Sequence, residues 1–148
     1  MQPEFYVFFS ELMKKDITIV TQGQGKNLLL KFDIPKGKHP SGPHTGWSLL
    51  FQNCHWRFDT QSESFGSEDS REPLAKLDLG RLETVMVTDP GRDVDLIFSN
   101  SIKLHVFCCT NNPTVEQWEI TSPVKGNIKV WGNGLAVLST TEPQPTIQ

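Results

Sequence analysis

The sequence predicts a mainly β protein in which two antiparallel meanders form a sandwich or a partly open barrel, with at most one or two short helices. Short runs rich in β-branched and aromatic residues recur along the chain, and turns with glycine, proline or asparagine separate them. In several runs every second residue is apolar; Leu28, Leu30 and Phe32, for example, alternate with Leu29 and Lys31. Such alternation is typical of strands that bury one face. All 148 residues are expected to form one domain.

The first apolar segment, residues 5–15, fits two structures. Its aromatic run favours a strand by propensity. The spacing of Phe8, Phe9, Leu12 and Met13 equally fits one face of a helix. The sequence leaves this segment open.

The next strands are expected at residues 17–21 and 28–32, followed by a loop over 35–46. Three prolines and three glycines exclude both helix and ladder from that loop. Strands over 47–51 and 54–58 then form a predicted hairpin about Gln52 and Asn53. Residues 60–73 are serine-rich, polar and acidic, which predicts a mobile linker.

The second half begins with a short helix or turn that ends at Gly80. Its central feature is a hairpin over residues 95–106, in which two apolar runs flank Ser99, Asn100 and Ser101. Further strands are expected at 82–87, 116–120, 128–131 and 135–138, and the tail from Ser139 is expected to fray.

The two halves read as a repeat, over residues 12–58 and 78–137. A shift of 66 residues brings Leu30 onto Leu96 and Phe32 onto Phe98. After the loop the shift grows to 71 residues, which brings Trp47 onto Trp118. A meander with one apolar face cannot bury that face alone, so two copies are expected to pack together.

The second half also resembles a family of small, uncharacterised bacterial β domains with duplicated halves. The resemblance is carried by residues 94–100, by residues 104–106 and by the acidic strand about Trp118, Glu116 to Ile120, with Pro123 and Gly126 after it. It covers residues 77–137 well and 12–58 loosely. Members are found near toxin loci, so the resemblance implies an immunity protein. Its motifs are structural, so no functional residue is carried over.

Composition and charge argue against several classes of protein. The formal net charge is −3 and the pI about 5.8, which argues against non-specific nucleic-acid binding. An odd set of three cysteines, two of them adjacent, is not a disulfide framework and indicates reduced thiols. The N-terminus lacks the basic region of a signal peptide, and no apolar run is long enough for a membrane span. A cytoplasmic protein is therefore expected.

No recognisable catalytic or metal-binding motif is found. The four histidines and three cysteines lack zinc-ligand spacing, and the glycines near Lys26 lack the phosphate-loop pattern. His44, His55 and Asp95 would be the ingredients of a dispersed active site, but they follow no known order. No cofactor, no metal and no enzymatic activity are expected.

The leading hypothesis is an immunity protein that binds a basic toxin, such as a nuclease, and occludes its active site. Acidic surface groups would provide the contacts. The candidate partner-binding residues are Glu63, Glu68, Asp69, Glu72, Asp89, Asp93 and Glu116. The alternative is a carbohydrate- or small-ligand-binding β module, because aromatic faces stack on sugars. Its candidate residues are Trp56, Trp131, His39 and His44.

Overall fold

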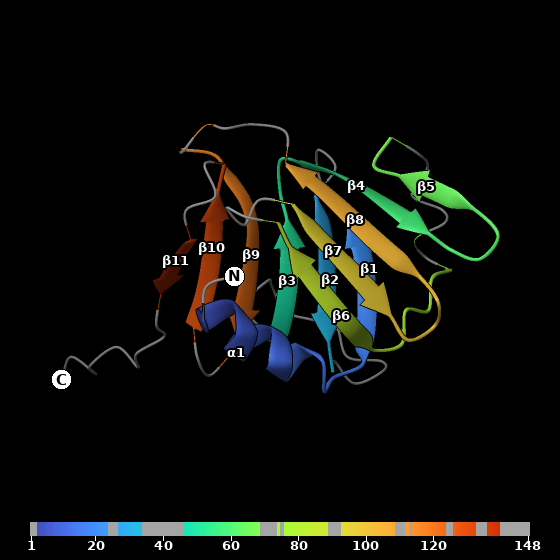
Figure 1. Cartoon of the computed structure of the whole chain (residues 1–148), viewed down its shortest axis with the longest axis horizontal. Coiled ribbons are helices and arrows are strands. Elements are labelled where there is room, and N and C mark those ends of the chain that lie inside the picture. Colours follow the sequence, from blue (N-terminus) through green and yellow to red (C-terminus); the bar gives the residue numbers. More distant parts are fainter. Residues whose placement is uncertain are drawn as a thin grey trace.

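Two antiparallel sheets packed face to face form a β sandwich, which confirms the predicted fold class (Figure 1). The computed structural model describes residues 3–23, 27–33, 46–68, 74, 76–88, 93–108, 112, 114–123, 126–132 and 136–139. The six-stranded sheet has the order β1 (Ile17–Gln22), β2 (Leu28–Phe32), β3 (Trp47–Phe51), β9 (Glu116–Ser122), β10 (Gly126–Trp131), β11 (Ala136–Ser139). The five-stranded sheet has the order β5 (Ser64–Gly66), β4 (Cys54–Asp59), β8 (Lys103–Cys108), β7 (Val94–Phe98), β6 (Leu82–Val87).

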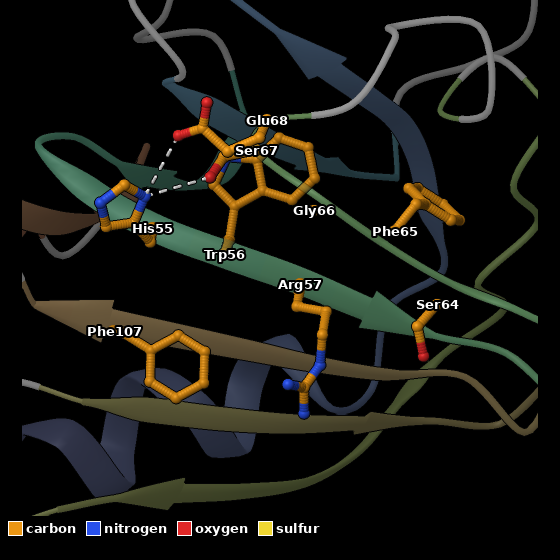
Figure 2. A pocket seen from close by; sticks show the side chains of 9 residues that line it. All are labelled: His55, Trp56, Arg57, Ser64, Phe65, Gly66, Ser67, Glu68 and Phe107. Atoms are coloured by element: carbon orange, nitrogen blue, oxygen red, sulfur yellow. Dashed lines mark hydrogen bonds and ion pairs between the residues drawn. The ribbon is translucent and has the colours of Figure 1, made fainter.

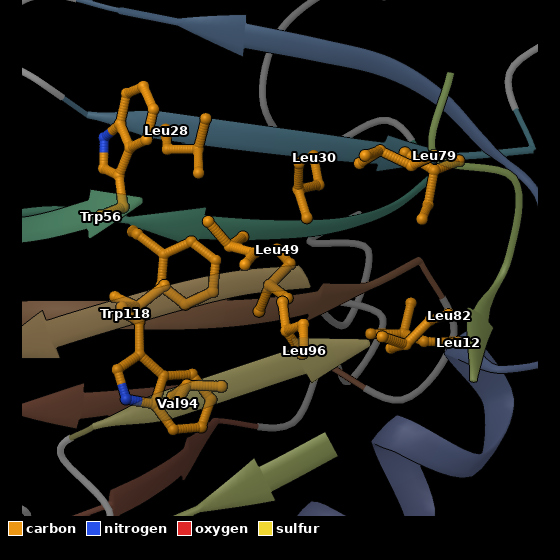
Figure 3. Close-up of a cluster of buried hydrophobic side chains, with 14 of the residues drawn as sticks. Leu12, Leu28, Leu30, Leu49, Trp56, Leu79, Leu82, Val94, Leu96 and Trp118 are labelled. Atoms are coloured by element: carbon orange, nitrogen blue, oxygen red, sulfur yellow. The ribbon is translucent and has the colours of Figure 1, made fainter. Parts of the chain in front are cut away.

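The core lies between the sheets, where the alternating apolar residues of both meet (Figure 3). In β2 the side chains of Leu28, Leu30 and Phe32 are buried, and in β7 those of Val94, Leu96 and Phe98 are. Burial of each such side chain contributes about 1.5–3 kcal/mol, so this alternation holds both central strands in register.

Helix α1 (Pro3–Leu12) resolves the open question at the N-terminus in favour of a helix. A proline begins it, where its missing N–H costs no intrahelical bond. Phe8, Phe9 and Leu12 form one buried face. The rings of Phe8 and Trp47 lie 5.8 Å apart, and those of Phe9 and Trp118 lie 6.1 Å apart. The helix therefore packs on β3 and β9 of the six-stranded sheet.

The predicted hairpin over residues 95–106 is confirmed, and its strands extend over residues 94–108. Strands β7 and β8 pair antiparallel, and Phe98 N donates to Ile102 O at 2.9 Å. Ser101 takes a left-handed conformation, with φ of 62°. Three-residue hairpin loops commonly need one such residue, which explains why the turn functions without a glycine.

The predicted hairpin about Gln52 and Asn53 is wrong. Strands β3 and β4 belong to different sheets, since β3 pairs with β9 and β4 with β8. Gln52 N donates to Gln117 O at 2.7 Å, and Asn53 has a φ of 53°. This short connection carries the chain across the sandwich, and both strands still turn their apolar faces to the core.

The predicted mobile linker, residues 60–73, is wrong over its first part. Residues 64–66 form β5, which pairs with β4, and the side chain of Phe65 is buried. Thr60 orders the turn before it, because its hydroxyl oxygen accepts from Glu63 N at 3.1 Å. A side chain at Gly66 would come within 2.8 Å of Trp56 O, so β5 packs closely only with glycine there. Residues 69–73 lie outside the described residues.

The two halves of the chain follow the same path. In each half a three-stranded meander enters one sheet and the next two strands enter the other: β1–β2–β3 with β4–β5, and β6–β7–β8 with β9–β10. Both meanders carry a register shift near the start of the first strand, between Ile17 and Ile19 and between Leu82 and Thr84.

The same hydrogen bonds accompany both register shifts. Asp33 N donates to Asp16 O at 2.9 Å, and Asp16 N donates to the Asp33 carboxylate at 3.0 Å. In the second half Ser99 N donates to Arg81 O at 2.8 Å, and Arg81 N donates to the Ser99 hydroxyl at 2.8 Å. Asp16 and Arg81 form a bridge to each other, so the two meanders meet at this corner.

The register corrects one equivalence between the halves. Trp118 pairs with Phe51 of β3, and Trp56 pairs with Val106 of β8, so Trp118 corresponds to Trp56 and not to Trp47. Leu30 and Leu96 do occupy matching places, each fully buried on the middle strand of a meander. The predicted equivalence of Trp47 with Trp118 is wrong because it matches the two positions by residue type alone. Trp47 begins a strand and is only half-buried.

Candidate functional site

A shallow hollow of about 350 Å³ lies on the outer face of the five-stranded sheet, over β4 and between β5 and β8 (Figure 2). Its lining combines aromatic, cationic and anionic side chains. The lining residues are His55, Trp56, Arg57, Ser64, Phe65, Gly66, Ser67, Glu68 and Phe107.

Strand alternation places the polar lining. Along β4, Cys54, Trp56 and Phe58 are buried in the core, so His55 and Arg57 point outward. Phe107 of β8 is the cross-strand partner of His55 and therefore lies on the same face. Phe107 is 42% exposed, whereas most large apolar residues of the sheet are buried.

A row of charged side chains continues from the hollow across the sheet. Arg57 donates to Asp59 from Nε at 3.0 Å and from the guanidinium nitrogen Nη2 at 3.3 Å. Asp59 Oδ2 lies 3.0 Å from His105 Nε2, and His105 Nδ1 lies 2.7 Å from Asp95 Oδ1. The His105 ring thus bridges carboxylates on β4 and β7, which fixes its orientation.

This row differs from a nucleophilic triad. The hydroxyl of Ser64 donates to Asp59 Oδ1 at 2.7 Å, so it contacts the carboxylate instead of the imidazole. In a Ser-His-Asp triad the imidazole takes the proton of the serine hydroxyl. Here both imidazole nitrogens face carboxylates, and the arrangement is suited to holding side chains in place.

Asp59 gives the row a pH dependence. Partial burial would raise the pKa of the Asp59 carboxyl, but hydrogen bonds from Ser64 and Arg57 outweigh it and hold that pKa below its ordinary value of 3.8. A carboxyl with a depressed folded pKa stabilises the fold above its unfolded pKa, and this stability is lost as pH falls through the folded pKa. The contribution of Asp59 is therefore complete near neutral pH and lost below about pH 4.

Asp59→Asn is expected to reduce the loss of stability between pH 5 and pH 3. Urea unfolding at a series of pH values would measure this. Glu63→Gln is the matched control, since Glu63 is an exposed carboxylate in the adjacent turn. Parallel stability curves for Asp59→Asn and the native chain would contradict the linkage.

The predicted partner-binding carboxylates do not gather on one surface. Glu63 and Glu68 flank β5 and are exposed, and Asp93, half-buried, precedes β7 in the same sheet. Glu116 lies on β9 of the other sheet, where its carboxylate is 3.4 Å from Lys129 Nζ. Of the four candidates that the structure describes, only Glu68 lines the hollow. The other three candidates, Asp69, Glu72 and Asp89, lie outside the described residues.

Of the four predicted ligand-binding residues, the structure describes two, and neither is fully exposed. Trp56 is 3% exposed and packs against Phe58 at 5.6 Å, so its indole face cannot serve as an open platform for a sugar. Trp131 is half-buried on the six-stranded sheet. His39 and His44 lie outside the described residues.

Sequence reasoning missed Phe107, Arg57, Asp59 and His105 as members of one site. Apolar–polar alternation along residues 54–58 and 103–106 was the available signal, since it puts Arg57 and His105 on the polar faces of their strands. Their meeting depends on the pairing of β4 with β8, and the expected hairpin between β3 and β4 assigned β4 a different neighbour.

Among the described residues, no three histidine, cysteine or acidic side chains are placed to hold a metal ion together. The described helix is too short to cross a membrane. Comparisons of the chain with protein-family models, with curated proteins and with solved structures gave no match.

Proposed function

We propose that the chain is a binding protein of the immunity type, which neutralises a cognate toxin by covering its active site. The outer face of the five-stranded sheet around the hollow is the proposed contact surface. One observation carries the proposal: Phe107 is 42% exposed on a sheet face otherwise rich in charged groups.

The composition of this surface supports binding to a protein. Aromatic residues and arginine are enriched in the cores of protein interfaces, and a few such anchors supply most of the binding energy. Phe107 and Arg57 lie on adjacent strands next to the hollow. The ion pair of Arg57 with Asp59 and the contact of His105 with Asp95 hold the Arg57 and His105 side chains in place before a partner binds. This lowers the entropy cost of binding.

The charges favour a basic partner. Asp59 and Asp95 lie in the charged row, Glu68 lines the hollow and Glu63 is exposed in the turn before β5. A toxin that handles nucleic acid has a basic active site, and complementary charge would speed the encounter and select the partner. The proposal places both proteins in the cytoplasm and requires no chemistry from this chain.

The test uses the protein encoded next to the gene for this chain as the partner. Co-expression is expected to relieve the toxicity of that protein, and calorimetry to give a dissociation constant. Phe107→Ala is expected to weaken binding at least about ten-fold, because it removes the exposed aromatic anchor beside the hollow. Tyr6→Ala is the matched control, since Tyr6 is an exposed aromatic residue on α1, 56% accessible.

Two results would count against the proposal. A neighbouring protein that is neither toxic nor bound would remove the immunity function. Tight binding that is unchanged in Phe107→Ala and lost in Tyr6→Ala would move the contact surface to the helix.

A further inference from the structure

We propose that Cys54 and Cys108 are a redox-sensitive pair, which oxidised glutathione converts into a cross-strand disulfide. The two residues stand directly opposite each other in the antiparallel pairing of β4 with β8. Opposite residues of antiparallel strands have Cα atoms about 4.5 or 5.5 Å apart, and a disulfide spans Cα atoms about 4.4–6.8 Å apart. The backbone therefore holds the two positions within the span of a disulfide. The modification is a property of the chain alone and does not rest on the immunity function.

The pair lies at the end of the ladder between the two strands. Cys54 is the first residue of β4 and Cys108 is the last of β8. Cys54 is 5% exposed, so a reagent reaches its sulfur only when this end of the ladder opens. The end of a ladder opens at a lower free-energy cost than its middle, because fewer hydrogen bonds and contacts are broken. The position at the end thus gives a small oxidant access to a buried thiol.

The Cys54 thiol is held only by weak bonds to backbone oxygens. Its sulfur lies 3.0 Å from Gln52 O, in the connection between the sheets, and 3.2 Å from Gln117 O of β9. A thiol is a weak hydrogen-bond donor. Rotation of the sulfur toward β8 therefore exchanges weak contacts for a covalent bond.

Gln117 provides a donor for the reactive form of Cys54. Its side chain is fully buried, and its Nε2 has no hydrogen-bond partner among the described residues. Its Oε1 lies 3.7 Å from Cys54 Sγ. A half-turn of the amide exchanges Oε1 and Nε2, so that an N–H group points at the sulfur. Because a thiolate is a much better acceptor than a thiol, this donor stabilises the nucleophilic form.

The reaction is two successive thiol–disulfide exchanges. The thiolate of one cysteine attacks oxidised glutathione, breaks its S–S bond and leaves a mixed disulfide, and one glutathione thiolate departs. The thiolate of the other cysteine then attacks the protein sulfur of the mixed disulfide. The bond between Cys54 and Cys108 forms and a second glutathione thiolate departs. The two protons released by the cysteines end on the two reduced glutathione molecules.

The link would secure one end of the hollow. His55 and Phe107 are the next pair of the ladder, and both line the hollow (Figure 2). A covalent bond at the preceding pair prevents the two strands from separating there. Oxidation would therefore restrain this part of the sheet, and reduction would release it.

The test equilibrates the full chain with mixtures of reduced and oxidised glutathione, blocks the remaining thiols and identifies linked peptides by mass spectrometry. Excess oxidised glutathione is expected to produce the link between Cys54 and Cys108, and excess reduced glutathione to remove it. The folded chain is expected to give at least about ten-fold more of this link than the chain unfolded in urea, where a long loop must close by chance.

Three serine variants assign the link. Cys108→Ser and Cys54→Ser are each expected to abolish it, and the serine hydroxyl at position 54 can still donate to Gln52 O and Gln117 O, which preserves the fold. Cys109→Ser is the matched control, because it removes the adjacent thiol, and it is expected to leave the yield unchanged. Glutathione adducts alone, a link that uses Cys109, or equal yields from the folded and unfolded chains would overturn the proposal.

Discussion

Trp118→Ala and Trp56→Ala are each expected to destabilise the protein by about 3–5 kcal/mol, the cost of truncating a large buried aromatic side chain. Both indoles lie in the core, 1% and 3% exposed. They occupy matching places in the two halves, since each pairs with the third strand of a meander. Equilibrium unfolding in urea would measure the loss.

Trp47→Ala is the matched comparison. This indole is half-buried at the start of β3 and contacts Phe8 from one side, so its truncation is expected to cost about 1–2 kcal/mol. Equal costs at Trp47 and Trp118, with a small cost at Trp56, would contradict the register described above. They would restore the equivalence that the 71-residue shift suggests.

Leu12→Ala is expected to destabilise the protein by about 3 kcal/mol, a typical cost for a buried leucine. Leu12 ends α1 and is fully buried among residues of the shared core. Met13→Ala, one residue later, is expected to change the stability by less than about 1 kcal/mol, because Met13 is exposed. Thermal unfolding followed by circular dichroism would compare the two variants.

The contrast between Leu12 and Met13 tests how the helix is placed on the sheet. Loss of Leu12 leaves a cavity between α1 and the sandwich, which the surrounding side chains fill only in part. If Met13→Ala proved the more harmful change, the buried face of the helix would be the other one, and the contacts of Phe8 and Phe9 would have to be reassigned.

Local patterns in the sequence were sufficient to predict the hairpin over β7 and β8 and every other described strand except β5. The apolar residues at every second position of Leu28–Phe32 and Val94–Phe98 predict which side of each strand is buried. The structure buries those sides. The turn at Ser99, Asn100 and Ser101 is short enough to force its two strands to pair. The mainly β fold class follows from these local facts, whereas the choice of a sandwich over a partly open barrel came from the structure.

Outside that hairpin, the partners of the strands were decided only by the tertiary structure. The apolar face of β4 is buried equally well beside β3 in a hairpin or beside β8 across the sandwich, so alternation cannot distinguish them. The connection at Gln52 and Asn53 selects the second, because it carries the chain from one sheet to the other. The sequence was also unable to decide between helix and strand for residues 5–15. The packing of Phe8 and Phe9 against the two indoles of β3 and β9 decides for a helix.

The candidate site depends on those partners. The sequence by itself marked Glu68 as an acidic contact and Asp95 as one ingredient of a dispersed active site, and it did not connect the two. Pairing of β4 with β8 and of β8 with β7 then brings Asp59, His105 and Asp95 within hydrogen-bonding distance and sets Phe107 beside the hollow. Alternation along one strand is a local property, whereas a surface made by three strands exists only after long-range pairing has chosen their neighbours.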